Sequence, residues 1–479
     1  MSKGPEEAII TGISRESCSN VSELPRVDRV ALRADLSELR QNLGQAALTS
    51  LVRAAIDRAR DDLLKDPAKP APSADVVADM VRSLATEAFA PRARRVINAT
   101  GVLLHTNLGR APLSQRASAA VSATMEGYCS IELDLATGKR GKRGAFMEAA
   151  LSQLTGSESA VVVNNCAAAV LLLLATVARG RPVIVSRGEL VEIGGGFRVP
   201  DVMAESGAKL VEVGTTNKTR VADYERALDA HPDTAAILRV HPGNFRQIGF
   251  VERPALADLA ALAKARNVSL LKDLGGGALV ELADAGFPGE PMVESAIRAG
   301  VNAVTFSTDK VLGGPQGGAI VGDEAIVGRV RKHPLIRAFR LGRLPMVALE
   351  ATLESYLAGS AWSDVPTLAM ARVDLASLRT RAEALVRALS ARGVTVRVAE
   401  TQAEMGGGSL AGRSIPSIGV VVSVADHDSA GAFVAHLREH RLPVIGRVDP
   451  SGVVLDLRTV APRDDEGLGD AVTLSWQRV

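Results

Sequence analysis

The sequence is poor in cysteine and in aromatic residues. Among its 479 residues are three cysteines, Cys18, Cys129 and Cys166, which lie far apart and form no CxxC pair. Neither a disulfide framework nor a zinc site is therefore expected, and a reducing cytoplasm fits this cysteine content best. Aromatic residues make up only 3% of the chain, too few for the row of stacking side chains with which proteins bind single-stranded nucleic acid.

The sequence also lacks an excess of one charge and a long apolar run. Lysine and arginine total 56 against 54 aspartates and glutamates, and the net charge of +2 would not draw the chain onto nucleic acid or an anionic membrane. Any RNA binding must be local. The first thirty residues contain acidic and polar residues where a secretory signal needs an apolar stretch. The longest apolar run, residues 167–178, is too short to span a bilayer. We expect a soluble, cytoplasmic protein with no membrane partner.

The apolar content is sufficient for a substantial core, since 47% of residues are hydrophobic and 23% are charged. Between residues 27 and 65, leucines recur at spacings of three and four, which predicts amphipathic helices. Three closely spaced prolines, Pro67, Pro70 and Pro72, then indicate a linker. We expect a helical N-terminal domain over residues 1–66, followed by a linker and a connecting helix over residues 67–95.

Beyond residue 96, short β-rich runs alternate with helical segments. Strands are predicted at residues 160–163, 182–185, 209–213, 235–240, 269–271, 303–306 and 318–321. The alternation predicts βαβ units and an α/β fold with a mostly parallel central sheet, in which ligands gather at the carboxyl ends of the strands. We place this large domain at residues 96–364. Residues 365–479 predict a compact α+β domain, with strands at 394–398 and 418–423 and a hairpin-like segment at 444–460.

Lys310 stands where a lysine is unusual. It comes just after a predicted strand and just before a glycine-rich turn that lets backbone approach a ligand closely. Desolvation at the end of a core strand favours a neutral amine, which can attack a carbonyl group. The alternative is an ordinary loop lysine.

Asp273 ends another predicted strand, where a carboxylate could keep a pyridinium nitrogen protonated and make the ring an electron sink. Its alternative is a turn aspartate before the glycines at 275–277.

A seat for a phosphate group is predicted at residues 163–169, where a strand meets the N-terminus of a helix. The unpaired N–H groups of such a terminus face an anion. Asn165, Cys166 and Ala167 begin this helix, although the asparagine could equally be a helix cap. Ser307 could add a hydroxyl donor, or could simply form a turn.

Other candidate groups are one histidine and several cations. His241 ends a predicted strand on the side where the site should lie, so it would contact a cofactor ring or move protons, unless it is a buried, hydrogen-bonded histidine. Arg110, Arg337 and Arg340 could bind an anion or could be surface arginines. The loop at 137–144 packs four cations among glycines, which suits contact with phosphates as well as it suits a solvated charge run.

Several long motifs occur in order along the chain, at residues 96–101, 104–110, 187–198, 213–217 and 309–316. With these motifs, and with residues 24–29 and 406–410, the chain resembles the bacterial L-seryl-tRNA(Sec) selenium transferases, or selenocysteine synthases, over nearly its whole length. It departs from the family at residues 275–277, where the family often has a serine among the glycines, and at Gly317, where alanine is more usual. Neither departure removes a proposed catalytic group.

The resemblance implies a fold-type-I pyridoxal-phosphate enzyme, in which Lys310 carries the cofactor as a Schiff base and Asp273 partners its ring nitrogen. The other residues that fall where the family has active-site residues are Asp309, Thr215, Thr216, Arg110, Arg337 and Arg340. By the same resemblance, the arginines would hold selenophosphate and the N-terminal domain would recognise tRNA by shape. The subunits would assemble as a ring of dimers, a decamer.

The resemblance also implies conversion of L-seryl-tRNA(Sec) to L-selenocysteinyl-tRNA(Sec), with selenophosphate as the selenium donor and a cofactor-bound aminoacrylyl-tRNA as the intermediate. Lys310, once displaced by the seryl amine, would remove the Cα proton. The nearest alternative is a related lyase that eliminates water or ammonia from a small amino acid. Such relatives typically lack the N-terminal helical domain, which favours the tRNA enzyme here. A catalytically silent RNA-binding paralogue would have lost Lys310 or Asp273, and both are present.

Overall fold

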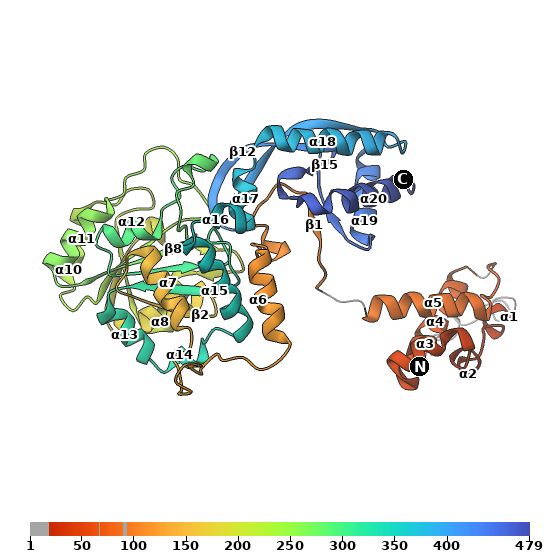
Figure 1. Cartoon of the computed structure of the whole chain (residues 1–479), viewed down its shortest axis with the longest axis horizontal. Helices are drawn as coiled ribbons and strands as arrows, with labels where there is room; N and C mark the ends of the chain where they lie inside the picture. The colour runs from red at the N-terminus through yellow and green to blue at the C-terminus, as the bar shows by residue number, and fades with distance from the viewer. Residues whose placement is uncertain (1–18, 67, 90–92) are drawn as a thin grey trace, which may run out of the picture. The chain divides into compact units, whose positions relative to one another are not determined.

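The computed structural model describes residues 19–66, 68–89 and 93–479, which divide into two compact units with the boundary between Arg95 and Val96 (Figure 1). The first unit is helical. Its elements are α1 (Ser19–Ser22), α2 (Val27–Ala31), the 3-10 turn η1 (Ala34–Leu36), α3 (Ser37–Leu43), α4 (Gln45–Lys65) and α5 (Ala74–Phe89). Leu48 and Val52 of α4 are buried against Val77 and Val81 of α5, so this unit has a hydrophobic core of its own.

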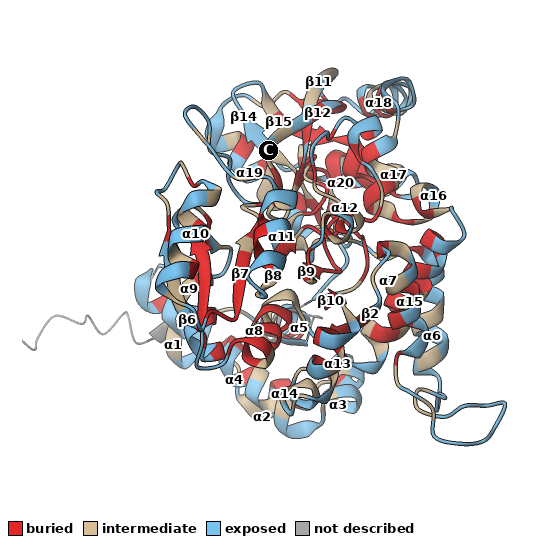
Figure 2. Cartoon of the chain, turned by 90° about the vertical axis from the view of Figure 1, so that its left-hand side faces the viewer, coloured by how far each residue is buried: buried red, intermediate tan, exposed pale blue. Residues whose placement is uncertain are grey.

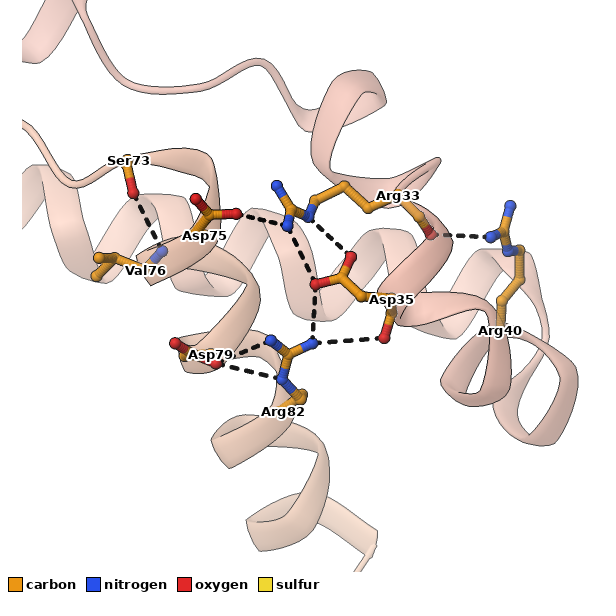
Figure 3. Close-up of polar contacts among 8 residues, drawn as sticks. All are labelled: Arg33, Asp35, Arg40, Ser73, Asp75, Val76, Asp79 and Arg82. Atoms are coloured by element: carbon orange, nitrogen blue, oxygen red, sulfur yellow. Dashed lines mark hydrogen bonds and ion pairs between the residues drawn. The ribbon is translucent and has the colours of Figure 1, made fainter.

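Helix α5 is part of the N-terminal unit rather than a connecting helix beyond it. Charged contacts reinforce the packing of its apolar face (Figure 3). Arg33 pairs with Asp35 at 2.9 Å and with Asp75 of α5 at 2.6 Å, and Arg82 of α5 reaches Asp35 at 3.2 Å. The two guanidinium groups, Arg33 foremost, lower the pKa of Asp35 to about 2. The unit therefore extends past the boundary expected at residue 66, because α5 packs into the same core as α4.

A seven-stranded sheet forms the centre of the second unit, in the order β2-β10-β9-β8-β7-β3-β6. Its strands are β2 (Ser159–Val163), β10 (Gly318–Gly322), β9 (Ala303–Ser307), β8 (Ser269–Gly275), β7 (Ala236–Val240), β3 (Pro182–Ser186) and β6 (Lys209–Val213). All seven predicted strands are present. Only β10 runs antiparallel to its neighbours, so the prediction of a mostly parallel sheet is confirmed.

Helices cover both faces of this sheet, and every residue of β2, β3, β9 and β10 is buried between them (Figure 2). One face packs against α7 (Ala145–Thr155), α10 (Val221–Ala230), α11 (Leu256–Ala265), α12 (Val293–Arg298) and α15 (Arg343–Leu357). The other face packs against α8 (Cys166–Val177), α9 (Val199–Ser206) and α13 (Glu324–Lys332). The nearly all-apolar composition of α8 fits this position, since it lies against the sheet and is covered in turn by α9 and α13.

The C-terminal part is an antiparallel sheet in the order β11-β12-β15-β14, covered by three helices. Its elements are β11 (Val396–Gly406), β12 (Ser409–Val422), β14 (Arg447–Asp449), β15 (Gly452–Asp456), α18 (Leu375–Ser390), α19 (His427–Glu439) and α20 (Asp465–Trp476). Apart from 3-10 turns, the remaining helices and strands of this unit are β1 (Ile97–Asn98), β4 (Glu192–Ile193), β5 (Phe197–Arg198), α6 (Gln115–Met125), α14 (Leu335–Ala338), α16 (Ala361–Asp364), α17 (Pro366–Arg372) and β13 (Val444–Ile445). The predicted α+β pattern is present.

The hairpin of β11 and β12 is much longer than the two short strands predicted there. Its tip turns through three consecutive glycines, Gly406 to Gly408, all with positive φ. The tip is anchored to the segment that follows β1, since the N–H groups of Leu103 and Leu104 donate to the carbonyls of Glu404 and Met405. The periodicity did not predict residues 399–417 as strand, because several of them are exposed and polar.

Two kinds of feature are absent from the described ranges. No helix there combines the length and the apolar character needed to cross a membrane. No group of three or more histidine, cysteine, aspartate or glutamate side chains there is placed to hold a metal ion.

Candidate active site at the ends of β8 and β9

Lys310 and Asp273 lie at the carboxyl ends of neighbouring parallel strands. Asp273 is in β8 and pairs in register with Thr305 of β9, and Lys310 follows the last residue of β9, Ser307, by three positions. Both charged side chains are buried, with Lys310 8% and Asp273 6% exposed. An amine and a carboxyl group are thus held out of water at the edge of the sheet where ligands of such folds bind.

Two neutral donors surround the Asp273 carboxylate. The hydroxyl of Thr305 donates to Oδ1 at 3.0 Å, and the thiol of Cys166 donates to the same oxygen at 3.6 Å. Burial, followed by the nearby Asp273 charge, raises the pKa of Cys166, so this group stays a protonated donor. Burial also raises the pKa of Asp273, while Thr305 and the Lys310 cation oppose that shift. A positive group brought against this carboxylate would stabilise its ionised form.

Asp309 is paired on both of its oxygens. Ser307 donates its hydroxyl to Oδ1 at 2.8 Å, and Arg110 donates from Nη1 to Oδ2 at 2.7 Å. Arg110 has a φ of 64°, in the left-handed region that costs a non-glycine residue about 1–2 kcal/mol. The pair joins two motifs that are 199 residues apart in sequence, and it fixes Asp309 beside Lys310.

The amine of Lys310 lies between glycines from two separate segments. Its Nζ is 3.7 Å from the position that a Cβ would take at Gly275 and 3.8 Å from the corresponding position at Gly408 in the hairpin tip. A Cβ at Gly243 would overlap the carbonyl oxygen of Gly408, so the loop after β7 contacts the same tip. The absence of side chains at these positions leaves room around the amine, and the tip of the β11–β12 hairpin lies beside it.

The predicted phosphate seat is at the N-terminus of α8. Asn165 caps this helix, since its side-chain oxygen accepts from the Ala168 N–H at 2.8 Å. Gly318 of β10 has no room for a Cβ, which would overlap the Asn165 carbonyl, so this strand packs directly against the start of the helix. The first N–H groups of a helix, here those of Cys166 and Ala167, have no acceptor within it. Because Cys166 also contacts Asp273, the helix terminus lies next to the buried carboxylate.

His241 follows β7 and is tied to Asp273 through the backbone, because its N–H donates to the Asp273 carbonyl at 2.8 Å. Burial lowers the pKa of its ring to about 4, and the charges of Lys272, Arg253 and Lys310 act in the same direction. The imidazole is therefore neutral at pH 7, which suits contact with an aromatic ring better than it suits service as an acid. It lines a cavity of about 350 Å³ beside the hairpin tip.

A second buried acid lines the same cavity. Glu290, between β8 and α12, is 4% exposed, and neither of its carboxylate oxygens has a hydrogen-bond partner among the described residues. Burial raises its pKa to about 7 in spite of the opposing charges of Lys310, Arg413 and Lys272. No motif or periodicity predicts this residue. The sequence feature that is connected with Glu290 is Gly276, because a Cβ atom at this position would overlap Glu290 Oε1.

The two remaining candidate arginines lie in α14 and just after it. Arg340 forms a bridge with Val163, the last residue of β2, and its guanidinium is 3.6 Å from Glu132. Arg337 is exposed on the short helix α14. Two cations of the loop at 137–144, Arg140 and Arg143, also pair with Glu132, so part of that basic run is ion-paired.

Thr215 and Thr216 are not brought to the lysine within this chain. They follow β6, the outermost strand, four positions from β9 in the sheet order, and both are exposed. Thr215 closes a local turn, with its hydroxyl 3.0 Å from the Lys218 carbonyl. The strand order explains the separation, because motif similarity gives no information on which strand lies at the edge.

The state of Glu290 makes stability depend on pH. Its folded pKa of about 7 is above the ordinary 4.5, so between those values the folded chain holds a proton that the unfolded chain has lost. Wild-type stability should therefore fall as pH rises through this range, and a Glu290→Gln variant, which cannot titrate, should gain relative to it. The gain between pH 5 and pH 8 should approach about 3 kcal/mol, at about 1.4 kcal/mol per pH unit. Denaturant unfolding at the two pH values measures it, with exposed Glu281→Gln as the control; an equal difference at both values would contradict the assignment.

Known proteins resemble this chain over most of its length. The family model for L-seryl-tRNA selenium transferase matches residues 96–461. The L-seryl-tRNA(Sec) selenium transferase of Hyphomonas neptunium is 42% identical over 453 residues, covering 94% of this chain and 97% of the relative. That of Moorella thermoacetica is 44% identical over 461 residues, covering 95% and 97%. Among solved structures, a D-glucosaminate-6-phosphate ammonia-lyase superposes with a TM-score of 0.57 at 22% identity, covering 82% of this chain and 98% of the other, which agrees with the expected fold. The chain therefore belongs to the L-seryl-tRNA selenium transferase family.

Proposed function

We propose that this protein converts L-seryl-tRNA(Sec) to L-selenocysteinyl-tRNA(Sec), using pyridoxal phosphate as cofactor and selenophosphate as selenium donor. The observation that carries the proposal is the buried Lys310 beside the buried Asp273, at the carboxyl ends of β8 and β9. Relatives named for this activity match at 42% and 44% identity over nearly the whole chain.

The residues present fit this cofactor. Lys310 would hold its aldehyde carbon, in the space left by Gly275 and Gly408. Asp273 would face the ring nitrogen, because its hydrogen-bond donors among the described residues are neutral and a cation would stabilise its ionised form. The N-terminus of α8, at Cys166 and Ala167 with Asn165 as its cap, would face the phosphate group.

When bound, pyridoxal phosphate supplies a carbonyl that captures an amine and a ring that accepts electron density from Cα. The chain's own residues do the rest. Lys310 Nζ, once free, takes the Cα proton of the seryl group. Asp309, fixed by Ser307 and Arg110, lies next to Lys310 in sequence and places a negative charge beside the amine. His241 is neutral at pH 7 and would contact the ring as an uncharged imidazole.

The donor and the RNA would bind around this centre. Guanidinium groups match the oxygens of a phosphate-like anion, and we assign selenophosphate to Arg110, Arg337 and Arg340. Of these, Arg110 is tied to the lysine's own segment, because it donates to Asp309. The helical unit before Val96 would bind the tRNA by shape, residues 96–364 the cofactor, and residues 365–479 would complete the site through the hairpin tip. Thr215 and Thr216 would contact the cofactor only if their exposed turn packs against the active site of a second subunit in the proposed decamer.

The competing function is that of a lyase acting on a small amino acid. The fold match to a D-glucosaminate-6-phosphate ammonia-lyase motivates this alternative. That match covers 82% of this chain, whereas the selenium transferases cover 94% and 95% at about twice the identity. The longer and closer match favours the tRNA substrate.

Purified protein incubated with seryl-tRNA(Sec) and selenophosphate should form selenocysteinyl-tRNA, detected by mass spectrometry of the released amino acid. A Lys310→Ala variant should be slower by at least about 10²-fold, because it lacks the group that holds the cofactor and moves the Cα proton. Lys264→Ala, an exposed lysine on α11, is the control and should match the wild type. Formation of no selenocysteinyl-tRNA, together with rapid turnover of free serine or another small amino acid, would assign the protein to the lyases.

Removing residues 1–95 should abolish binding of tRNA while the visible absorbance of the bound cofactor persists. The reason is that the deleted unit has its own hydrophobic core and the proposed cofactor residues all lie beyond Val96. Filter binding of labelled seryl-tRNA(Sec) and an absorbance spectrum of the same sample measure the two properties. Unchanged tRNA affinity in the truncated protein would refute the RNA-binding role of this unit.

A further inference from the structure

Glu290 is a buried acid that neither the sequence motifs nor the proposed cofactor contacts employ. It lies in the segment between the 3-10 turn η4 (Ala283–Ala285) and α12, and it faces the cavity of about 350 Å³ that His241 also lines. Its side chain is almost fully enclosed, yet both carboxylate oxygens are without a hydrogen-bond partner among the described residues. A buried carboxyl group without a partner is costly, so its retention at the edge of a reaction site points to a use.

The backbone of the turn after Asp273 places Glu290 close to the lysine. Oε1 of Glu290 lies against Gly276, where no Cβ could fit, and Lys310 Nζ lies against the adjacent Gly275. The turn is held to the lysine's own segment, because the Val311 N–H donates to the Gly276 carbonyl at 3.1 Å. The carboxyl group of Glu290 and the amine of Lys310 therefore lie against two consecutive residues, Gly276 and Gly275.

A second polar group without a partner faces the same point. Ser409, the first residue of β12, is 2% exposed, and its hydroxyl has no hydrogen-bond partner among the described residues. That oxygen is 3.5 Å from the position of a Cβ at Gly276. An acid and a hydroxyl that converge from two segments, each unsatisfied, suit a ligand that carries a hydroxyl group.

The charges around Glu290 favour the ionised acid, yet burial dominates. The cations that act on it are Lys310, Arg413 and Lys272, and the cavity is further lined by His241, Arg246 and Arg253. Of these, His241 is neutral at pH 7. Burial nevertheless raises the pKa of Glu290 to about 7, so near neutrality the group is able both to give and to take a proton.

We propose that Glu290 is a further catalytic acid of this site, which gives its proton to the hydroxyl group that leaves Cβ of the seryl substrate. The inference rests on the proposed function. Lys310 Nζ takes the Cα proton, the electron pair of the Cα–H bond becomes the Cα–Cβ double bond, and the Cβ–O bond breaks. The proton of Glu290 joins the departing oxygen, which leaves as water. The Lys310 ammonium then returns a proton to the Glu290 carboxylate, and both groups are restored.

A Glu290→Gln variant separates this role from a structural one, because glutamine keeps the shape of the side chain but has no proton to give. The variant should retain the visible absorbance of the cofactor. In D₂O it should still exchange the Cα hydrogen of seryl-tRNA(Sec) at close to the wild-type rate, since that step belongs to Lys310. Its formation of selenocysteinyl-tRNA should fall by about 10²–10⁴-fold. The wild-type rate should decline above about pH 7 as the acid ionises, and this decline should be absent from the variant.

Glu281→Gln, an exposed acid in the same connection, is the matched control and should behave as the wild type. Glu290→Asp, which keeps a proton on a shorter side chain, should recover part of the lost rate. The role is overturned if Glu290→Gln turns over within about threefold of the wild type, or if Cα exchange and product formation fall by the same factor. A wild type that forms no selenocysteinyl-tRNA would refute the proposed function and this step together, whereas an active wild type beside an equally active variant refutes only the role of Glu290.

Discussion

The burial of charged groups at the carboxyl ends of β8 and β9 is the constraint on which the site depends. One amine and three carboxyl groups come together there, and each acid is accommodated differently. Asp309 is ion-paired with Arg110 and accepts from Ser307. Asp273 accepts from two neutral donors and has Lys310 as its nearby cation. Glu290 has no hydrogen-bond partner within the part of the chain that the structure describes, and burial favours its protonated form. Three acids in different states therefore lie at one edge of the sheet. Asp273 would be stabilised in its ionised form by a cation, Asp309 is held in an ion pair, and Glu290 titrates near neutral pH.

Close backbone approach makes this concentration of groups possible. Gly275 and Gly276 bring the turn after β8 against the lysine and the glutamate, and Gly408 brings in the hairpin tip from more than a hundred residues later in the chain. Gly318 allows β10 to contact the start of α8, which places the proposed phosphate seat beside Asp273. A side chain at Gly276 would collide with Glu290, and one at Gly318 would collide with the backbone at the start of α8.

The sequence predicted those parts of the site that depend on local pattern. The apolar strand patterns and the glycines that follow them predicted that Lys310 and Asp273 lie at strand ends. A strand followed by a helix of small residues predicted the helix N-terminus at residues 165–167. Long-range packing determined the rest. The position of β6 at the sheet edge separates Thr215 from Lys310, and the long hairpin and the inclusion of α5 in the N-terminal core depend on contacts far apart in sequence. Glu290 was missed for the same reason, since its environment comes from β8, β12 and the loop after β7.

The most direct test of this site is to identify the lysine that carries pyridoxal phosphate in the purified protein. Borohydride reduces the bond between a lysine and this cofactor to a stable amine, and proteolysis with mass spectrometry then locates the added mass. The buried position of Lys310 beside Asp273 predicts a single modified residue, Lys310. Modification of the neighbouring Lys272 instead, or of no lysine in protein that has taken up the cofactor, would contradict the assignment.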